Sequence, residues 1–186
     1  EMIACLWPVS SGTEREWQSN QIKTADTKLM QQYIYAFWKN RNDKNPEAEW
    51  KKYEEQVKIV NKIFAVGKVK GYYSDRGRVY LQYGAPDARQ QVMSEPDSYP
   101  YEVWQFYRIK DPVTEQMQTN KKFVFYNPDL VTNNYTLIHS DARGEIRDDR
   151  WELKLAKRNT QSRDFDDTKP NGQFGGQADD LFKNPH

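Results

Sequence analysis

The chain from residue 24 to residue 66 places its apolar residues at helical spacing. Between residues 24 and 42 they fall on one helical face, and between residues 46 and 66 they recur every three or four positions. Thr24 or Asp26 suits the N-cap of the first helix, and Pro46 suits the first turn of the second. We therefore predict two amphipathic helices, the second ending near Gly67, which pair antiparallel and cover a sheet.

Beyond residue 77 the spacing of apolar residues changes to two, which is typical of β-strands. The predicted strands are RVYLQY, RQQVM, YEVWQFYR, KKFVFY and NYTLIHS. Short sequences rich in Gly, Pro, Asn and Asp separate them and indicate antiparallel neighbours. The chain entry, residues 1–17, is predicted as a short edge strand and a turn, and residues 148–159 as a last helix. The fold class expected is α+β, with a four- to five-stranded antiparallel sheet and two or three helices packed on one face.

Length and composition favour one domain followed by an appendage. Residues 1–158 form the predicted α+β domain, and the Gly-rich residues 159–186 form a predicted extended polar tail. Because the chain begins at Glu1 without a leader sequence, we expect it to be part of a longer precursor. It contains no run of the ~20 apolar residues that a transmembrane helix requires, so we predict no membrane-spanning segment.

Charge and cysteine content exclude several classes of function. The net charge is +1 and no basic block is present, so nucleic acid is excluded as a partner. One cysteine, Cys5, allows neither an intrachain disulfide nor a cysteine zinc site. The acidic residues Asp164, Asp166 and Asp167 lack the Gly and the closing Glu of a calcium loop. We therefore predict no metal and no cofactor.

The stretch GYYSDRGRVYLQYGAPD, residues 71–87, raises the question of a phosphate-binding loop. Such a loop needs clustered glycines between a strand and a helix N-terminus, and the apolar alternation after Gly77 predicts a strand instead. We interpret the stretch as a corner in which Arg76 and Arg78 pair with carboxylates. The candidate carboxylates are Asp75, Asp87 and Glu102.

His139 and Ser140 are the residues that would suggest a hydrolytic triad. Adjacent residues of a strand point to opposite faces, so His139 cannot activate Ser140 directly. We predict that His139 is a neutral, hydrogen-bonded strand residue.

Residues 71–87 resemble the motif of the GWxTD domain, a bacterial family. Its pattern Gly-Trp-x-Thr-Asp-Arg-Gly-Arg, a strand and Tyr-Gly-x-Pro-Asp appears here with Tyr72 in place of Trp and Ser74 in place of Thr. The similarity extends to FWKNRN, YEVWQFY, FVFYNPD, YTLIHSDARGE and ADDLFKNP. The resemblance implies an exported bacterial envelope protein, periplasmic or lipid-anchored. The family has no established activity, so it implies no catalytic residue.

We favour a non-catalytic interaction or assembly module over an enzyme. The partner expected is a protein or the preceding region of the same precursor, with a glycan as the alternative. The binding or structural corner comprises Tyr72, Tyr73, Ser74, Asp75, Arg76, Arg78 and Asp87, and the candidate sheet-face contacts are Trp104, Tyr107 and His139. One rival hypothesis is an envelope hydrolase acting on glycan or peptide, with His139, Asp75 or Glu102 in a pocket. The other is a carbohydrate-binding domain with a row of exposed aromatic side chains.

Overall fold

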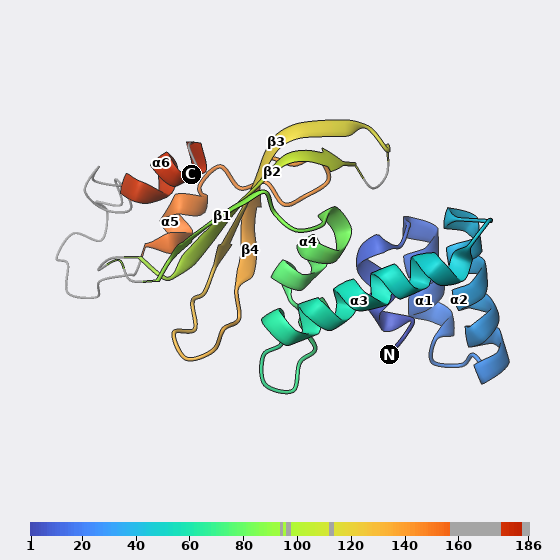
Figure 1. Cartoon of the computed structure of the whole chain (residues 1–186). Coiled ribbons are helices and arrows are strands. Elements are labelled where there is room, and N and C mark those ends of the chain that lie inside the picture. The colour runs from blue at the N-terminus through green and yellow to red at the C-terminus, as the bar shows by residue number, and fades with distance from the viewer. Residues whose placement is uncertain (94, 96–97, 112–113, 157–175, 184–186) are drawn as a thin grey trace. The chain divides into compact units, whose positions relative to one another are not determined.

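The computed structural model describes residues 1–93, 95, 98–111, 114–156 and 176–183 (Figure 1). The chain forms two compact units, Glu1–Gly84 and Ala85–His186. The segment 159–175 of the predicted tail and the aspartates Asp164, Asp166 and Asp167 lie outside the described residues. Within the described part of the chain, no helix combines the length and the apolar character that crossing a membrane requires.

The N-terminal unit is helical. It consists of the 3-10 helix η1 (Ala4–Val9), α1 (Gly12–Gln21), α2 (Thr27–Arg41), α3 (Pro46–Phe64), the 3-10 helix η2 (Gly71–Tyr73) and α4 (Asp75–Tyr83). The two predicted helices are confirmed as α2 and α3. Asp26 caps α2 by accepting the N–H of Leu29, and Asn45 caps α3 ahead of Pro46.

The predicted edge strand at the chain entry is wrong, because this segment forms η1 and α1. Ser11 and Glu14 make a capping box, in which each side chain accepts a backbone N–H of the other residue. Glu14 also receives two hydrogen bonds of 2.8 Å from Arg41 on α2, which ties the start of α1 to the end of α2.

The predicted strand RVYLQY is also wrong, because these residues form most of α4. Their alternation of apolar residues and their β-branched and aromatic side chains favoured a strand. Ser74 decides the local structure, because its hydroxyl accepts the N–H of Gly77 and so caps the first turn of a helix. The helix ends at Gly84, whose φ of 92° lies in the left-handed region that glycine adopts readily.

The C-terminal unit contains a four-stranded antiparallel sheet in the order β1-β2-β3-β4. The strands are β1 (Ala88–Val92), β2 (Tyr101–Lys110), β3 (Met117–Tyr126) and β4 (Thr136–Ser140), followed by α5 (Trp151–Leu155) and α6 (Gly176–Lys183). The predicted α+β class with a four-stranded antiparallel sheet is confirmed. The connection between β2 and β3 is shorter than the gap between the predicted strands YEVWQFYR and KKFVFY, because β2 extends to Lys110 and β3 begins at Met117.

Both faces of the sheet carry buried side chains. On one face, residues of the strands form an apolar core with residues of α5 and α6: Tyr101, Val103, Val124, Ile138, Trp151, Leu155 and Ala178. The other face of β2 and β3 carries Trp104, Phe106, Phe123 and Phe125, each at most 1% exposed. A β-bulge between β3 and β4 sets Val124 opposite His139 and Phe125 opposite Leu137, so Ile138 is the extra residue. The helices that the structure packs on the sheet are thus α5 and α6, while α2 and α3 belong to the N-terminal unit.

Candidate functional site

Two glycines of the motif bring α3, η2 and α4 into close contact. A β-carbon on Gly71 would lie 2.1 Å from the carbonyl oxygen of Val60 in α3. A β-carbon on Gly77 would lie 2.0 Å from the carbonyl oxygen of Gly71 and 2.8 Å from Cγ1 of Val60. Most of these neighbours are backbone atoms, which cannot rotate away. Gly71 and Gly77 are therefore required by the packing of three helical segments.

Ser74 links η2 to α4 through two hydrogen bonds. Its hydroxyl accepts the N–H of Gly77 at 3.0 Å and donates to the carbonyl of Gly71 at 2.7 Å. The same side chain thus caps a helix and fixes the distance between the two glycines. A threonine hydroxyl can make the same two bonds, which explains why Ser and Thr are both compatible with this position.

The two tyrosines of the motif have different environments. Tyr72 is 7% exposed, whereas Tyr73 is 62% exposed, and their ring centroids are 4.5 Å apart. Burial, followed by a hydrogen bond with Tyr73, raises the pKa of the Tyr72 hydroxyl above its usual range. Tyr72 is part of the core, and Tyr73 presents its ring to solvent beside it.

The charged residues of the motif lie along α4. Asp75 is its first residue, where the helix dipole favours a carboxylate. Arg76 is 2% exposed, and its guanidinium carbon lies 5.1 Å from the ring centroid of Phe64. Arg78 is partly buried and donates to the side-chain oxygen of Gln82, one turn on, at 3.1 Å. Arg76 is thus a buried residue of the helical unit, with an aromatic ring of α3 beside it.

The other two carboxylates expected in the corner lie in the C-terminal unit. Asp87 accepts the backbone N–H of Tyr107 at 2.7 Å. The side chain of Glu102 is fully buried, and its oxygens accept from Arg89 at 2.8 and 3.1 Å and from the indole of Trp104 at 2.9 Å. Arg89 was not predicted as a partner of Glu102, although the alternation of RQQVM and YEVWQFYR places both residues on neighbouring strands.

The sheet-face candidates differ in exposure. Trp104 is fully buried, His139 is 6% exposed and Tyr107 is 58% exposed. The Nδ1 atom of His139 accepts the N–H of Asp148 at 3.2 Å, and burial lowers the pKa of its imidazole. His139 is therefore a buried strand residue that accepts a backbone hydrogen bond, and of the three only Tyr107 presents its side chain to solvent.

Lys122 is a buried cation that sequence reasoning missed. It is 6% exposed on β3, and its Nζ donates to the carbonyl oxygens of Phe182 and of Lys183, the latter at 2.8 Å. Burial lowers the pKa of this ammonium group. The signal available in the sequence was its place two residues before Val124, on the inward side of a strand.

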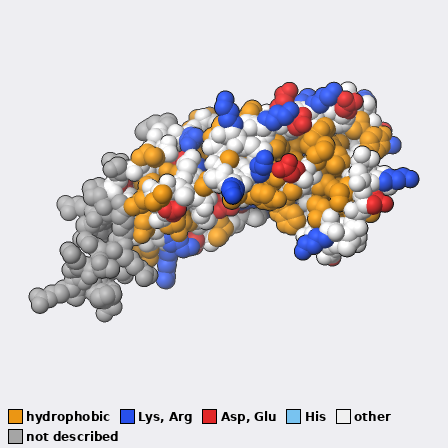
Figure 2. Space-filling model, turned by 90° about the horizontal axis from the view of Figure 1, so that it is seen from below, with side chains coloured by type: hydrophobic (Ala, Val, Ile, Leu, Met, Phe, Trp, Pro, Cys, Tyr) orange, Lys and Arg blue, Asp and Glu red, His pale blue; other side chains and the backbone are white. Residues whose placement is uncertain are grey.

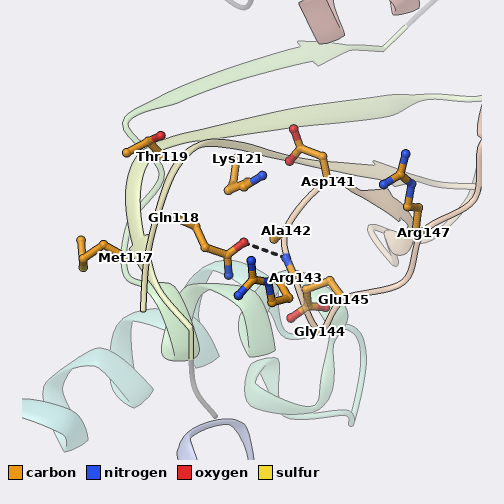
Figure 3. Close-up of a pocket in the computed structure, with 10 residues that line it drawn as sticks. All are labelled: Met117, Gln118, Thr119, Lys121, Asp141, Ala142, Arg143, Gly144, Glu145 and Arg147. Carbon is orange, nitrogen blue, oxygen red and sulfur yellow. Dashed lines mark hydrogen bonds between the residues drawn. The ribbon is translucent and has the colours of Figure 1, made fainter. Parts of the chain in front are cut away.

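An open hollow of about 520 Å³ lies between the start of β3 and the loop 141–147 (Figure 3). Its charged lining residues are Lys121, Asp141, Arg143, Glu145 and Arg147. The N–H of Arg143 donates to the side-chain oxygen of Gln118 at 2.8 Å and fastens the loop to β3. The lining therefore carries charged groups of both signs. None of the residues proposed for hydrolysis, His139, Asp75 or Glu102, lines it.

Apolar side chains are also exposed on the N-terminal unit. On the face shown in Figure 2 they gather over its helices, with charged side chains around them. The exposed apolar residues of this unit include Met2, Trp7, Ile63 and Tyr73. Among the described residues, no group of three or more His, Cys, Asp or Glu side chains could hold a metal ion.

The comparisons with known proteins identify the family. No curated protein and no solved structure matches the chain significantly. The family model of the GWxTD domain matches residues 1–152, which takes in the whole N-terminal unit and most of the C-terminal unit. The chain belongs to the GWxTD domain family.

Proposed function

We propose that this chain is a binding module that acts in the assembly of an exported bacterial envelope protein and catalyses no reaction. The observation that carries the proposal is the use of the motif residues in packing. Gly71 and Gly77 have no room for a β-carbon, Ser74 caps a helix and Tyr72 is buried. These residues hold α3, η2 and α4 together in a rigid helical junction. A rigid junction is a suitable support for a binding surface.

Tyr73 is the residue of this junction that we assign to the partner. Its neighbours in sequence, Tyr72 and Ser74, are fixed by burial and by two hydrogen bonds. Its own ring is 62% exposed, and tyrosine supplies a large contact area at a low cost in conformational entropy. Exposed apolar side chains on the same unit, shown in Figure 2, add surface of the kind that protein partners cover.

The alternative of an envelope hydrolase receives less support from the geometry. It requires His139, Asp75 or Glu102 in an open pocket with a catalytic environment. His139 instead accepts a backbone N–H inside the unit, and Glu102 is fully buried with Arg89 and Trp104. The carbohydrate-binding alternative retains Tyr107 as its exposed sheet-face aromatic residue.

The export and envelope parts of the proposal rest on the family. Proteins that carry this domain tend to be exported, periplasmic or lipid-anchored, often with a further region before the domain. The partner we propose is a protein, either that preceding region or a separate envelope component. Fractionation of the source cells with an antibody to the chain tests the location, and recovery in the cytosol alone contradicts it.

Site-specific photo-crosslinking tests the binding surface. A photoreactive phenylalanine at position 73 is compared with the same residue at position 35, because Tyr73 and Tyr35 are 62% and 61% exposed on the same unit. In the full-length protein expressed in its own cells, we expect one saturable protein adduct from position 73 and none from position 35. Equal adducts from both positions, or none from position 73, contradict the assignment of Tyr73.

A second measurement addresses the absence of catalysis. The purified chain is incubated with cell-wall glycan and peptide substrates, in parallel with a His139→Asn variant. We expect equal, background-level product from both. Turnover by the wild-type chain that the substitution abolishes would overturn the non-catalytic proposal.

A further inference from the structure

The helix α6 (Gly176–Lys183) packs on the sheet through apolar side chains on one of its faces. Ala178 is 1% exposed within the apolar core, and Leu181 and Phe182 pack against the same core. The three residues are spaced i, i+3 and i+4, so they lie on one face of the helix. This face meets the side of the sheet that carries Tyr101 and Val103.

Phe182 contacts two aromatic side chains of the unit. Its ring centroid lies 5.5 Å from that of Trp151 and 5.2 Å from that of His139, the latter in an edge-on arrangement. The ammonium group of Lys122 lies 5.2 Å from the same ring centroid. Aromatic and cation contacts of this geometry are typical of an anchor residue seated in a binding groove.

Lys122 also binds the end of the helix. Its ammonium group donates to the carbonyl oxygens of Phe182 and Lys183, which belong to the last turn of α6. A cation at the C-terminal end of a helix is favoured by the helix dipole. The sheet therefore recognises both the apolar face and the terminus of a short helix.

The groove and the helix come from different parts of the sequence. The strand residues of the groove and Trp151 lie within residues 101–151, whereas α6 begins only at Gly176. We propose that this side of the sheet is a docking groove for a short amphipathic helix with a small residue, then large apolar residues three and four positions later. The chain's own α6 occupies the groove as a tethered ligand. This inference does not depend on the proposed function.

Hydrogen exchange of the full-length chain tests this proposal. A tethered ligand leaves its groove without unfolding the sheet, so we expect the amides of α6 to exchange at least about a hundredfold faster than those of β3. A synthetic peptide with the sequence of residues 174–186, added in excess, competes for the groove and accelerates the exchange of α6 further. A peptide with Phe182→Ala serves as the control, and we expect it to need an about tenfold higher concentration for the same acceleration of exchange.

Substitutions in the groove give an independent readout. Lys122→Met removes the cation at the end of α6, and we expect exchange of α6 to rise about tenfold or more while exchange of β2 is unchanged. Lys121→Met is the matched control on the same strand and leaves the exchange of α6 at the wild-type rate. Equal exchange rates for α6 and β3 in the wild-type chain overturn the proposal, because α6 is then an integral part of the unit. An excess of the wild-type peptide that leaves the exchange of α6 unchanged also overturns it.

Discussion

Replacing Gly77 by alanine gives opposite expectations from local propensity and from packing. Alanine is the better helix former, by up to about 1 kcal/mol, so propensity alone predicts a more stable α4. The packing predicts the reverse, because the new β-carbon would lie 2.0 Å from the carbonyl oxygen of Gly71. The sign of the change in stability therefore distinguishes the two effects.

The magnitude follows from the distance. An ordinary contact of a β-carbon is 3.4 Å or more, so α4 must move away from η2 by more than about 1 Å. Overpacking of this kind costs about 1–3 kcal/mol, and a gap of that size also weakens the dispersion contacts of Val79 and Val60, both fully buried. We expect a net loss of about 2 kcal/mol, or a Tm lower by about 4–8 °C for a chain of this length.

The assay is urea and thermal denaturation followed by circular dichroism, with Gly12→Ala as the matched control. Gly12 is the first residue of α1, and a β-carbon there would meet nothing within 4 Å. The control is expected to leave stability unchanged or to raise it slightly. A Gly77→Ala protein as stable as the control would refute the close-packing account of the motif.

Two further predictions concern the cap and the buried histidine. Ser74→Ala removes the cap of α4 and is expected to cost about 1 kcal/mol, whereas Ser74→Thr keeps the hydroxyl and costs less, as urea midpoints will show. His139 has a folded-state pKa below its unfolded value of about 6.5, so the unfolded chain binds the proton more readily and stability falls as the pH drops below that value. A urea-midpoint series from pH 7.5 to pH 5 is expected to fall more steeply for the wild-type chain than for His139→Asn, and equal slopes contradict the buried, neutral state.

The elements that could be predicted from the sequence were those in which capping and periodicity agree. The helix α3 has Pro46 at its start and an apolar stripe along its length, and both signals point to the same structure. The strands β2 and β3 contain aromatic and β-branched residues and are separated by turn residues. The strand order of the sheet could be predicted from these short connections, because strands joined by short connections usually pair with each other.

The segment α4 could not be recognised by periodicity alone. Val79, Leu81 and Tyr83 alternate as in a strand. The signal for a helix was Ser74, a residue type that favours the N-cap position, and it caps α4 in the structure. In the entry segment, the Ser11–Glu14 capping box was the available signal for α1, whereas the 3-10 helix η1 before it has no side-chain cap.

The candidate site depended on contacts that no local pattern contains. The need for glycine at position 71 arises from the carbonyl of Val60, eleven residues earlier in sequence, and the need at position 77 arises from the carbonyl of Gly71 and the side chain of Val60. Arg89 and the indole of Trp104 bind Glu102, and Lys122 binds carbonyls that lie sixty and sixty-one residues further along the chain. Residue types and spacing could identify the motif, but only the fold shows what each of its residues touches.

The central claim, that the motif forms a helical junction closed by its glycines, is tested most directly by nuclear Overhauser contacts in the full-length chain. The account predicts contacts between the α-protons of Gly77 and the γ-methyl groups of Val60, and between the α-protons of Gly71 and Asn61. It also predicts helical Cα chemical shifts from Asp75 to Tyr83. Strand-like shifts over these residues, without the contacts to Val60 and Asn61, would contradict it.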